Sequence, residues 1–162
     1  MPEEFVFEAA VGAASGALHY LGTLGYQAPY ENPDNRRKQV RSFASSISRG
    51  RPSDTLGLHD ARRSAETANT PFSFFGLQLM FGRRLLSTSY SLQSSGGSLM
   101  TSWRFEASND LVNWHMLDAR YGHLHTREQL SAMAKPGSVT TWAVDQRIFL
   151  KKRVGTDGFS AF

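Results

Sequence analysis

Apolar and polar residues alternate in several short stretches of the chain, with the two-residue period of a β-strand. The clearest stretch covers residues 101–108, where Trp103, Phe105 and Ala107 would share one face. Weaker alternation predicts further strands over residues 4–8, 39–47, 72–81, 85–93, 113–119, 139–144 and 147–153. About seven or eight short strands with turns between them are typical of a β-sandwich or barrel. The pattern therefore predicts an all-β, antiparallel protein.

The segments between these strands carry turn and helix signals. The pair Asn109 and Asp110 favours a tight turn, which would join the flanking strands as a hairpin. Thr126 and Gln129 fit a capping box, which predicts a single short helix after it. Residues 48–70 show no periodicity, and compact domains seldom keep so long a loop without a function. We therefore expect one domain over residues 1–162, with at most one short helix.

The composition and the amino terminus indicate in which cellular compartment the protein resides. The chain has 162 residues, of which 40% are hydrophobic, enough for one sizeable core. It has no cysteine, which fits a reducing compartment. The amino terminus is acidic, whereas a signal peptide starts with basic residues. The longest apolar run, residues 72–81, is too short for a transmembrane segment. A cytoplasmic or nuclear protein is the expectation.

Five segments in order resemble the discoidin domain, also called the coagulation-factor type C or galactose-binding-like domain. The most specific is residues 103–117, which read Trp-Arg-Phe-Glu-Ala-Ser-Asn-Asp-Leu-Val-Asn-Trp-His-Met-Leu. The others lie at residues 82–92, at 40–46 with Gly50 and Pro52, at 18–23 leading to 30–33, and at 125–126 with 136–138 and 141–142. The order is most similar to intracellular discoidin domains of HECT-type ubiquitin ligases, BTB proteins and muskelin.

This resemblance implies an antiparallel jelly-roll β-sandwich of about eight strands. It implies that Trp103 and Trp114 lie on adjacent strands and seal the core. The chain departs from the family after about residue 155, where a further strand is expected. We therefore expect either that this strand is abbreviated or that the chain is a piece of a longer one. A missing strand would leave a sheet edge exposed or filled by a partner.

The family binds its ligands with loops at one end of the sandwich, which here would be residues 26–35, 48–55 and 59–63. The chain carries a net charge of +4, which is either a solvated surface or a sign of an acidic partner. Arginines gather in these loops, and a guanidinium forks onto carboxylates and phosphates. By contrast, we interpret Arg83 and Arg84 as charges at the edge of a strand that discourage aggregation. The candidate ligand-binding residues are Tyr26, Tyr30, Asn32, Arg49, Arg51, His59 and Arg62.

Catalytic and metal signals are weak. His123 and His125 would share a face of a strand, but no cysteine or third ligand has convincing spacing. A Gly-X-Ser-X-Gly nucleophile elbow and a Gly-Lys-Ser/Thr phosphate loop are both missing from the sequence. The sequence therefore predicts a non-catalytic protein with no cofactor and no metal site.

Two functions remain open. The first is a module that binds a protein or peptide, within a ubiquitin-ligase or scaffold assembly of several domains or subunits. The alternative is binding of nucleic acid, anionic lipid or glycan through the Arg-rich loops, which salt would weaken.

Overall fold

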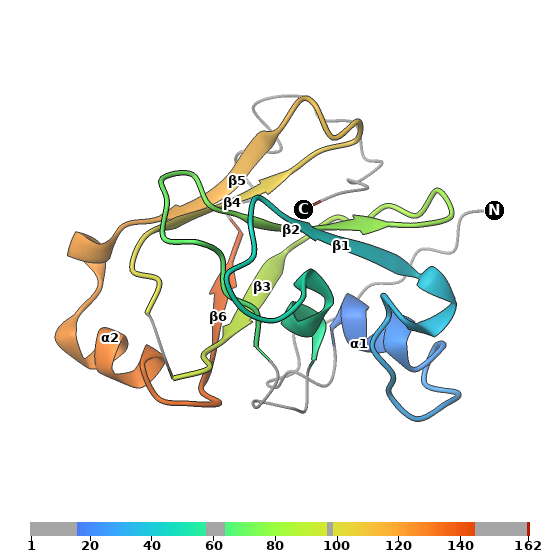
Figure 1. The fold of residues 1–162 in the computed structure, drawn as a ribbon, viewed down its shortest axis with the longest axis horizontal. Coiled ribbons are helices and arrows are strands. Elements are labelled where there is room, and N and C mark those ends of the chain that lie inside the picture. The colour runs from blue at the N-terminus through green and yellow to red at the C-terminus, as the bar shows by residue number, and fades with distance from the viewer. Residues whose placement is uncertain (1–15, 58–63, 97–98, 145–161) are drawn as a thin grey trace.

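The computed structural model describes residues 16–57, 64–96, 99–144 and 162. Within them six strands pair two by two, and every pair is antiparallel (Figure 1). The pairs are β1 (Val40–Ala44) with β2 (Phe75–Leu79), β3 (Ser89–Gln93) with β6 (Val139–Ala143), and β4 (Trp103–Ala107) with β5 (His115–Arg120). The predicted strand-rich, antiparallel character is confirmed. The strands predicted at residues 4–8 and 147–153 lie outside the described residues.

The β4–β5 hairpin closes with a turn whose polar side chains bind its own backbone. The Asp110 carboxylate accepts hydrogen bonds from the N–H groups of Val112 (2.9 Å) and Asn113 (2.7 Å). Ser108 Oγ accepts bonds from the N–H groups of Asp110 and Leu111. Hydrogen bonds from Asn113 hold the pKa of the Asp110 carboxyl well below its ordinary value. The predicted hairpin and its Asn-Asp turn are confirmed.

Trp114 does not take the place expected for it. The indole directly precedes β5, at the turn end of the hairpin, and is 37% exposed. Trp103 lies at the opposite end of the hairpin, across from Arg120. The buried apolar side chains of this hairpin are those of Ala107 and Leu117. The expectation that Trp114 seals the core is therefore wrong, because a strand pattern identifies a face but not which end of it is covered.

Among the described residues two short α-helices accompany the strands, α1 (Ala17–Gly22) and α2 (Arg127–Met133). The predicted capping box of α2 is confirmed, with Thr126 Oγ1 accepting from the Gln129 N–H and Gln129 Oε1 accepting from the Thr126 N–H. The expectation of at most one helix is wrong, since α1 forms in a glycine-rich stretch. The chain also makes single 3-10 turns at η1 (Arg36–Lys38), η2 (Pro52–Leu56) and η3 (Gly122–Leu124).

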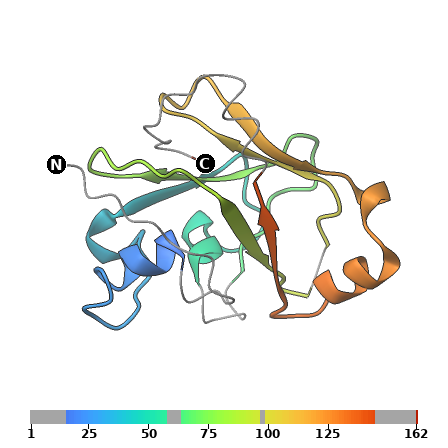
Figure 2. The ribbon, with the colours of Figure 1, turned by 180° about the vertical axis from the view of Figure 1, so that it is seen from behind.

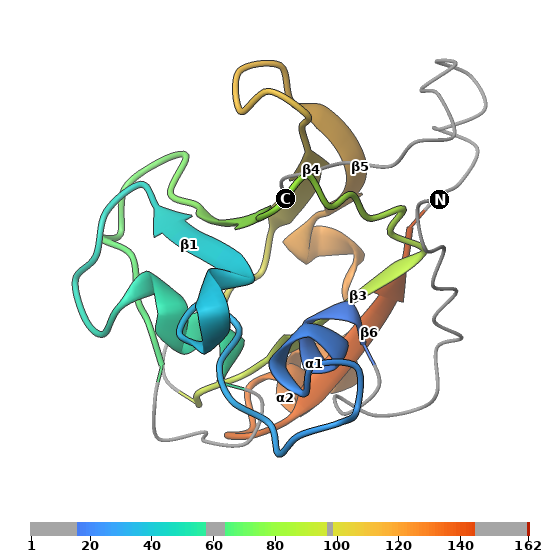
Figure 3. The ribbon, with the colours of Figure 1, turned by 90° about the vertical axis from the view of Figure 1, so that its right-hand side faces the viewer.

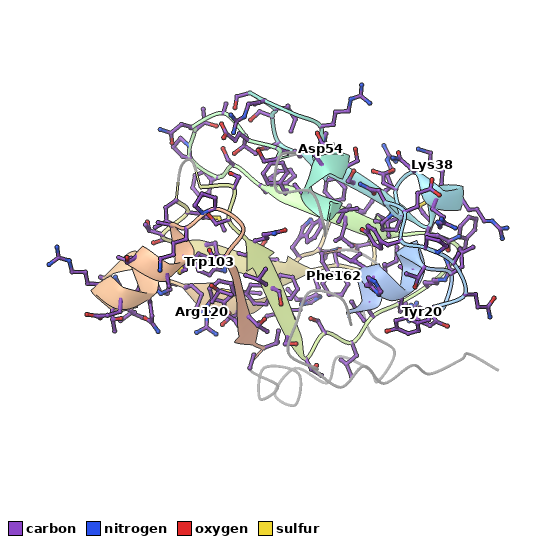
Figure 4. The ribbon with its side chains drawn as sticks, turned by 90° about the horizontal axis from the view of Figure 1, so that it is seen from below. Tyr20, Lys38, Asp54, Trp103, Arg120 and Phe162 are labelled. Carbon is purple, nitrogen blue, oxygen red and sulfur yellow. The ribbon has the colours of Figure 1, made fainter. Side chains whose placement is uncertain are left out.

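In the part of the chain that the structure describes, two clusters of buried side chains form the core, and Phe162 packs against both. The first cluster joins α1, η2 and the β1–β2 pair through Leu21, Val40, Leu56 and Leu79. The second lies under the β4–β5 hairpin and contains Ala107, Leu117 and Val144. Figure 4 shows Phe162 between the side that carries Tyr20, Lys38 and Asp54 and the side that carries Trp103 and Arg120.

The outer edges of the β1–β2 pair are partly occupied by other segments. On β2, the backbone of Phe162 exchanges two hydrogen bonds with Leu77, of 2.9 and 2.7 Å. On β1, the N–H of Ser42 donates to the Asp34 carboxylate and the N–H of Val40 donates to the Pro33 carbonyl. Paired edges cannot recruit other chains at these positions.

The views agree on the arrangement of these parts. Seen from behind, the β3–β6 pair lies between the α1 side and the α2 side of the molecule (Figure 2). Seen from the side, β1 and the β3–β6 pair flank α1, and the tip of the β4–β5 hairpin lies far from α1 (Figure 3). Neither α-helix of the described residues has the length and apolar composition needed to cross a membrane.

Candidate functional site

Of the three loops predicted to bind ligand, residues 59–63 lie outside the described residues. The structure brings the other two, residues 26–35 and 48–55, together next to η2. The Tyr30 hydroxyl donates a hydrogen bond to the Leu56 carbonyl at 2.5 Å. The Asn32 side-chain amide donates to the Ser53 carbonyl at 2.7 Å. Tyr30 and Asn32 thus direct polar groups into the protein and tie the loop after α1 to η2. We name this region, residues 23–35 together with 48–57, the loop end.

Gly22 explains how Tyr30 reaches this position. A Cβ at residue 22 would lie 2.4 Å from the Tyr30 ring and 2.6 Å from the Glu31 carbonyl oxygen. Only glycine leaves room for so close an approach. The Gly22 carbonyl in turn accepts a hydrogen bond from the Glu31 N–H. The last residue of α1 therefore fixes the path of the loop.

Tyr26 lies on an aromatic stack at the start of the loop end. Its ring centroid is 5.7 Å from that of His19 and 5.6 Å from that of Tyr20, and the residue is 57% exposed. Thr23 Oγ1 accepts a hydrogen bond from the Tyr26 N–H. His19 stacks on Tyr30 as well, with the rings nearly parallel. An exposed ring supported in this way is a firm apolar surface for a ligand.

The two arginines of the loop end stand in different surroundings. Arg49 forms an ion pair with Glu66, and the two residues also exchange backbone hydrogen bonds. Its side chain remains 60% exposed. Arg51 is exposed, and its backbone N–H donates to the Asp54 carboxylate at the start of η2. Both guanidinium groups can therefore meet an acidic ligand, with Arg49 oriented by Glu66.

Of the candidate residues, Tyr26, Arg49 and Arg51 present exposed surface, whereas Tyr30 and Asn32 hold the loops in place. His59 and Arg62 lie outside the described residues. Sequence reasoning missed His19, whose ring lies against both Tyr26 and Tyr30. Its only signal in the sequence was its place beside Tyr20 and seven residues before Tyr26.

A second polar arrangement, also missed from sequence, lies between the hairpin and the β3–β6 pair. Trp103 Nε1 donates to the Tyr90 hydroxyl, which donates to the Asp118 carboxylate, both at 2.7 Å. Arg120 Nε donates to the same carboxylate oxygen at 2.7 Å. The Tyr90 ring stacks on Phe105 at 4.4 Å. Burial, with the hydrogen bond to Asp118, raises the pKa of Tyr90 to about 12.

The polar groups of this Tyr90–Asp118 network are hydrogen-bonded to one another. The Asp118 carboxylate, which lies in this partly buried layer, therefore has hydrogen-bond partners for its charge. His125 stacks on Trp103 and His123 stacks on Tyr121. Within the part of the chain that the structure describes, no three His, Asp or Glu side chains are arranged to hold a metal ion.

Comparison of the chain with protein-family models, with curated proteins and with solved structures found no match in any of the three.

Replacing Gly22 by alanine should displace the Tyr30 ring and loosen the loop end. Overpacking of this kind costs about 1–3 kcal/mol of unfolding free energy. Denaturant unfolding, with limited proteolysis of the loop end, measures both effects. Gly16→Ala is the matched control, since a Cβ there meets nothing within 4 Å. Equal stability of Gly22→Ala and wild type would contradict the proposed packing.

Raising the pH should remove a contribution of Tyr90 to stability. The folded state holds the phenol proton more tightly than the unfolded state, whose pKa is the ordinary 10.0. The contribution is therefore complete below pH 10 and is lost as the pH rises towards 12. After allowance for solvent screening of a half-buried ring, we expect a loss of about 1 kcal/mol.

Urea unfolding at a series of alkaline pH values tests this expectation. The difference in unfolding free energy between wild type and Tyr90→Phe should shrink across that pH range, whereas Tyr121→Phe should follow wild type throughout. A constant difference for Tyr90→Phe would contradict the role assigned to its hydroxyl.

Proposed function

We propose that the chain is a non-catalytic, intracellular binding module with a discoidin-like jelly-roll β-sandwich, and that its loop end recognises a protein or peptide. The observation that carries the proposal is the pair of hydrogen bonds by which Tyr30 and Asn32 join two distant loops next to η2. Loops fixed in this way lose little conformational entropy when a ligand binds. The antiparallel hairpin that follows the family's Ser-Asn-Asp pattern supports the proposed fold.

The exposed groups favour an acidic segment of a protein as the ligand. Arg49 and Arg51 supply two cations on one short stretch, and Tyr26 supplies a supported ring. Arginine and tyrosine are the residues that most often dominate protein interfaces. By the family resemblance, the partner belongs to a ubiquitin-ligase or scaffold assembly.

The test compares partners captured from cell extract by three immobilised proteins: wild type, Arg49→Ala/Arg51→Ala and Arg104→Ala/Arg127→Ala. The last variant removes the same charge from exposed positions on β4 and α2. We expect specific partners to bind wild type and this control alike, and recovery by Arg49→Ala/Arg51→Ala to fall about tenfold or more, since charged hydrogen bonds contribute roughly 1.5–3 kcal/mol each.

The Arg49–Glu66 ion pair is exposed, so its loss should cost at most about 1 kcal/mol and leave the fold intact. Circular dichroism checks that point. Unchanged recovery of every partner by a folded Arg49→Ala/Arg51→Ala protein would overturn the assignment of the loop end.

A further inference from the structure

The outer face of the β1–β2 pair differs in character from its inner face. The inner face carries Val40 and Leu79, both buried in the first core cluster. Because side chains alternate along a strand, Arg41 and Phe43 lie on the outer face. Across the ladder they oppose Gln78 and Gly76.

One end of this outer face is aromatic. The Phe43 ring lies directly over Gly76, since a Cβ at residue 76 would come within 2.4 Å of two of its ring carbons. Phe74 stands edge-on to Phe43, with ring centroids 6.2 Å apart, and is 50% exposed. The absence of a side chain at Gly76 therefore lets an aromatic ring lie along the sheet.

The other end is basic. Arg83 Nη1 donates a hydrogen bond to the Gln39 side-chain carbonyl at 2.5 Å, and its guanidinium lies 5.5 Å from the centroid of the exposed Phe81 ring. Gln39 immediately precedes β1, so its hydrogen bond holds Arg83 at the same end of β1 as Arg41. Among the described residues neither arginine forms an ion pair.

We propose that this outer face binds single-stranded nucleic acid, with Arg83 and Arg41 on phosphates and the Phe43 and Phe74 rings against bases. Aromatic rings beside a row of cations are the combination that single-strand binding proteins use. The rings favour this ligand over a simple polyanion, which would need the charges alone. The site is separate from the loop end and does not require Arg49 or Arg51.

Fluorescence anisotropy with labelled oligothymidine and oligouridine of about 15 nucleotides tests the proposal. Wild type should bind at about 50 mM salt and weaken as salt rises to about 200 mM. Arg41→Ala/Arg83→Ala should lose about tenfold or more in affinity. Its slope of log K against log salt should be shallower by about 1.4, since each phosphate on a single strand contributes about 0.7.

Three further measurements separate the possible outcomes. Phe43→Leu/Phe74→Leu should weaken binding of the oligonucleotides and leave binding of inorganic polyphosphate unchanged, because only bases stack. Arg49→Ala/Arg51→Ala should bind oligonucleotides like wild type, which keeps this test independent of the proposed function. Phosphatidylserine vesicles should not compete for the site.

The proposal is overturned if no oligonucleotide binds at low salt, or if a folded Arg41→Ala/Arg83→Ala protein binds as tightly as wild type. Equal loss of oligonucleotide and polyphosphate binding in the phenylalanine variant would also overturn it. Binding to the vesicles through Arg41 and Arg83, without binding to the oligonucleotides, would point to a membrane surface instead.

Discussion

The architecture depends on side-chain packing between strand pairs that share no ladder. Among the described residues each of the three pairs is a separate two-stranded sheet. An isolated two-stranded sheet is marginal in water, so the pairs must gain their stability from a common core. That core consists of two clusters, and Phe162 packs against both. The backbone of Phe162 also pairs with Leu77 on the edge of β2. Phe162 therefore contacts both clusters and is held on β2 by its backbone.

The proposed binding surfaces follow from how the first cluster is built. Leu21 and Leu56 hold α1 and η2 against the inner face of β1 and β2, and the loop end connects these same elements. Gly22 then admits Tyr30, whose hydroxyl completes the link to η2. Burial of the inner face leaves the alternate residues of β1 outward, which exposes Arg41 beside Phe43. A rigid loop end and a mixed basic and aromatic strand face are therefore two results of one packing arrangement.

Local patterns predicted most of the elements, and contacts between distant residues account for what they missed. The β4–β5 hairpin and α2 depend on signals within a few residues, namely strict alternation around Asn109–Asp110 and the Thr126–Gln129 capping box. Helix α1 was missed because Gly16 and Gly22 suggest flexibility, while its stability comes from packing of Leu21 on β1 and η2. Tyr30 and Asn32 were predicted to bind ligand because they lie in a loop that corresponds, by the resemblance, to a ligand-binding loop. Their partners, Leu56 and Ser53, lie more than 20 residues away, a distance that no local pattern covers.

Native-state hydrogen exchange of backbone amides tests the central packing claim most directly, because it reports the free energy of opening for each strand. If Phe162 joins the two clusters, ladder amides of the β1–β2 pair and of the β4–β5 hairpin should exchange with the same, global opening free energy in wild type. In Phe162→Ala the two sets should separate, with one pair opening more easily than the other. Separate opening free energies already in wild type, unaffected by Phe162→Ala, would contradict the account.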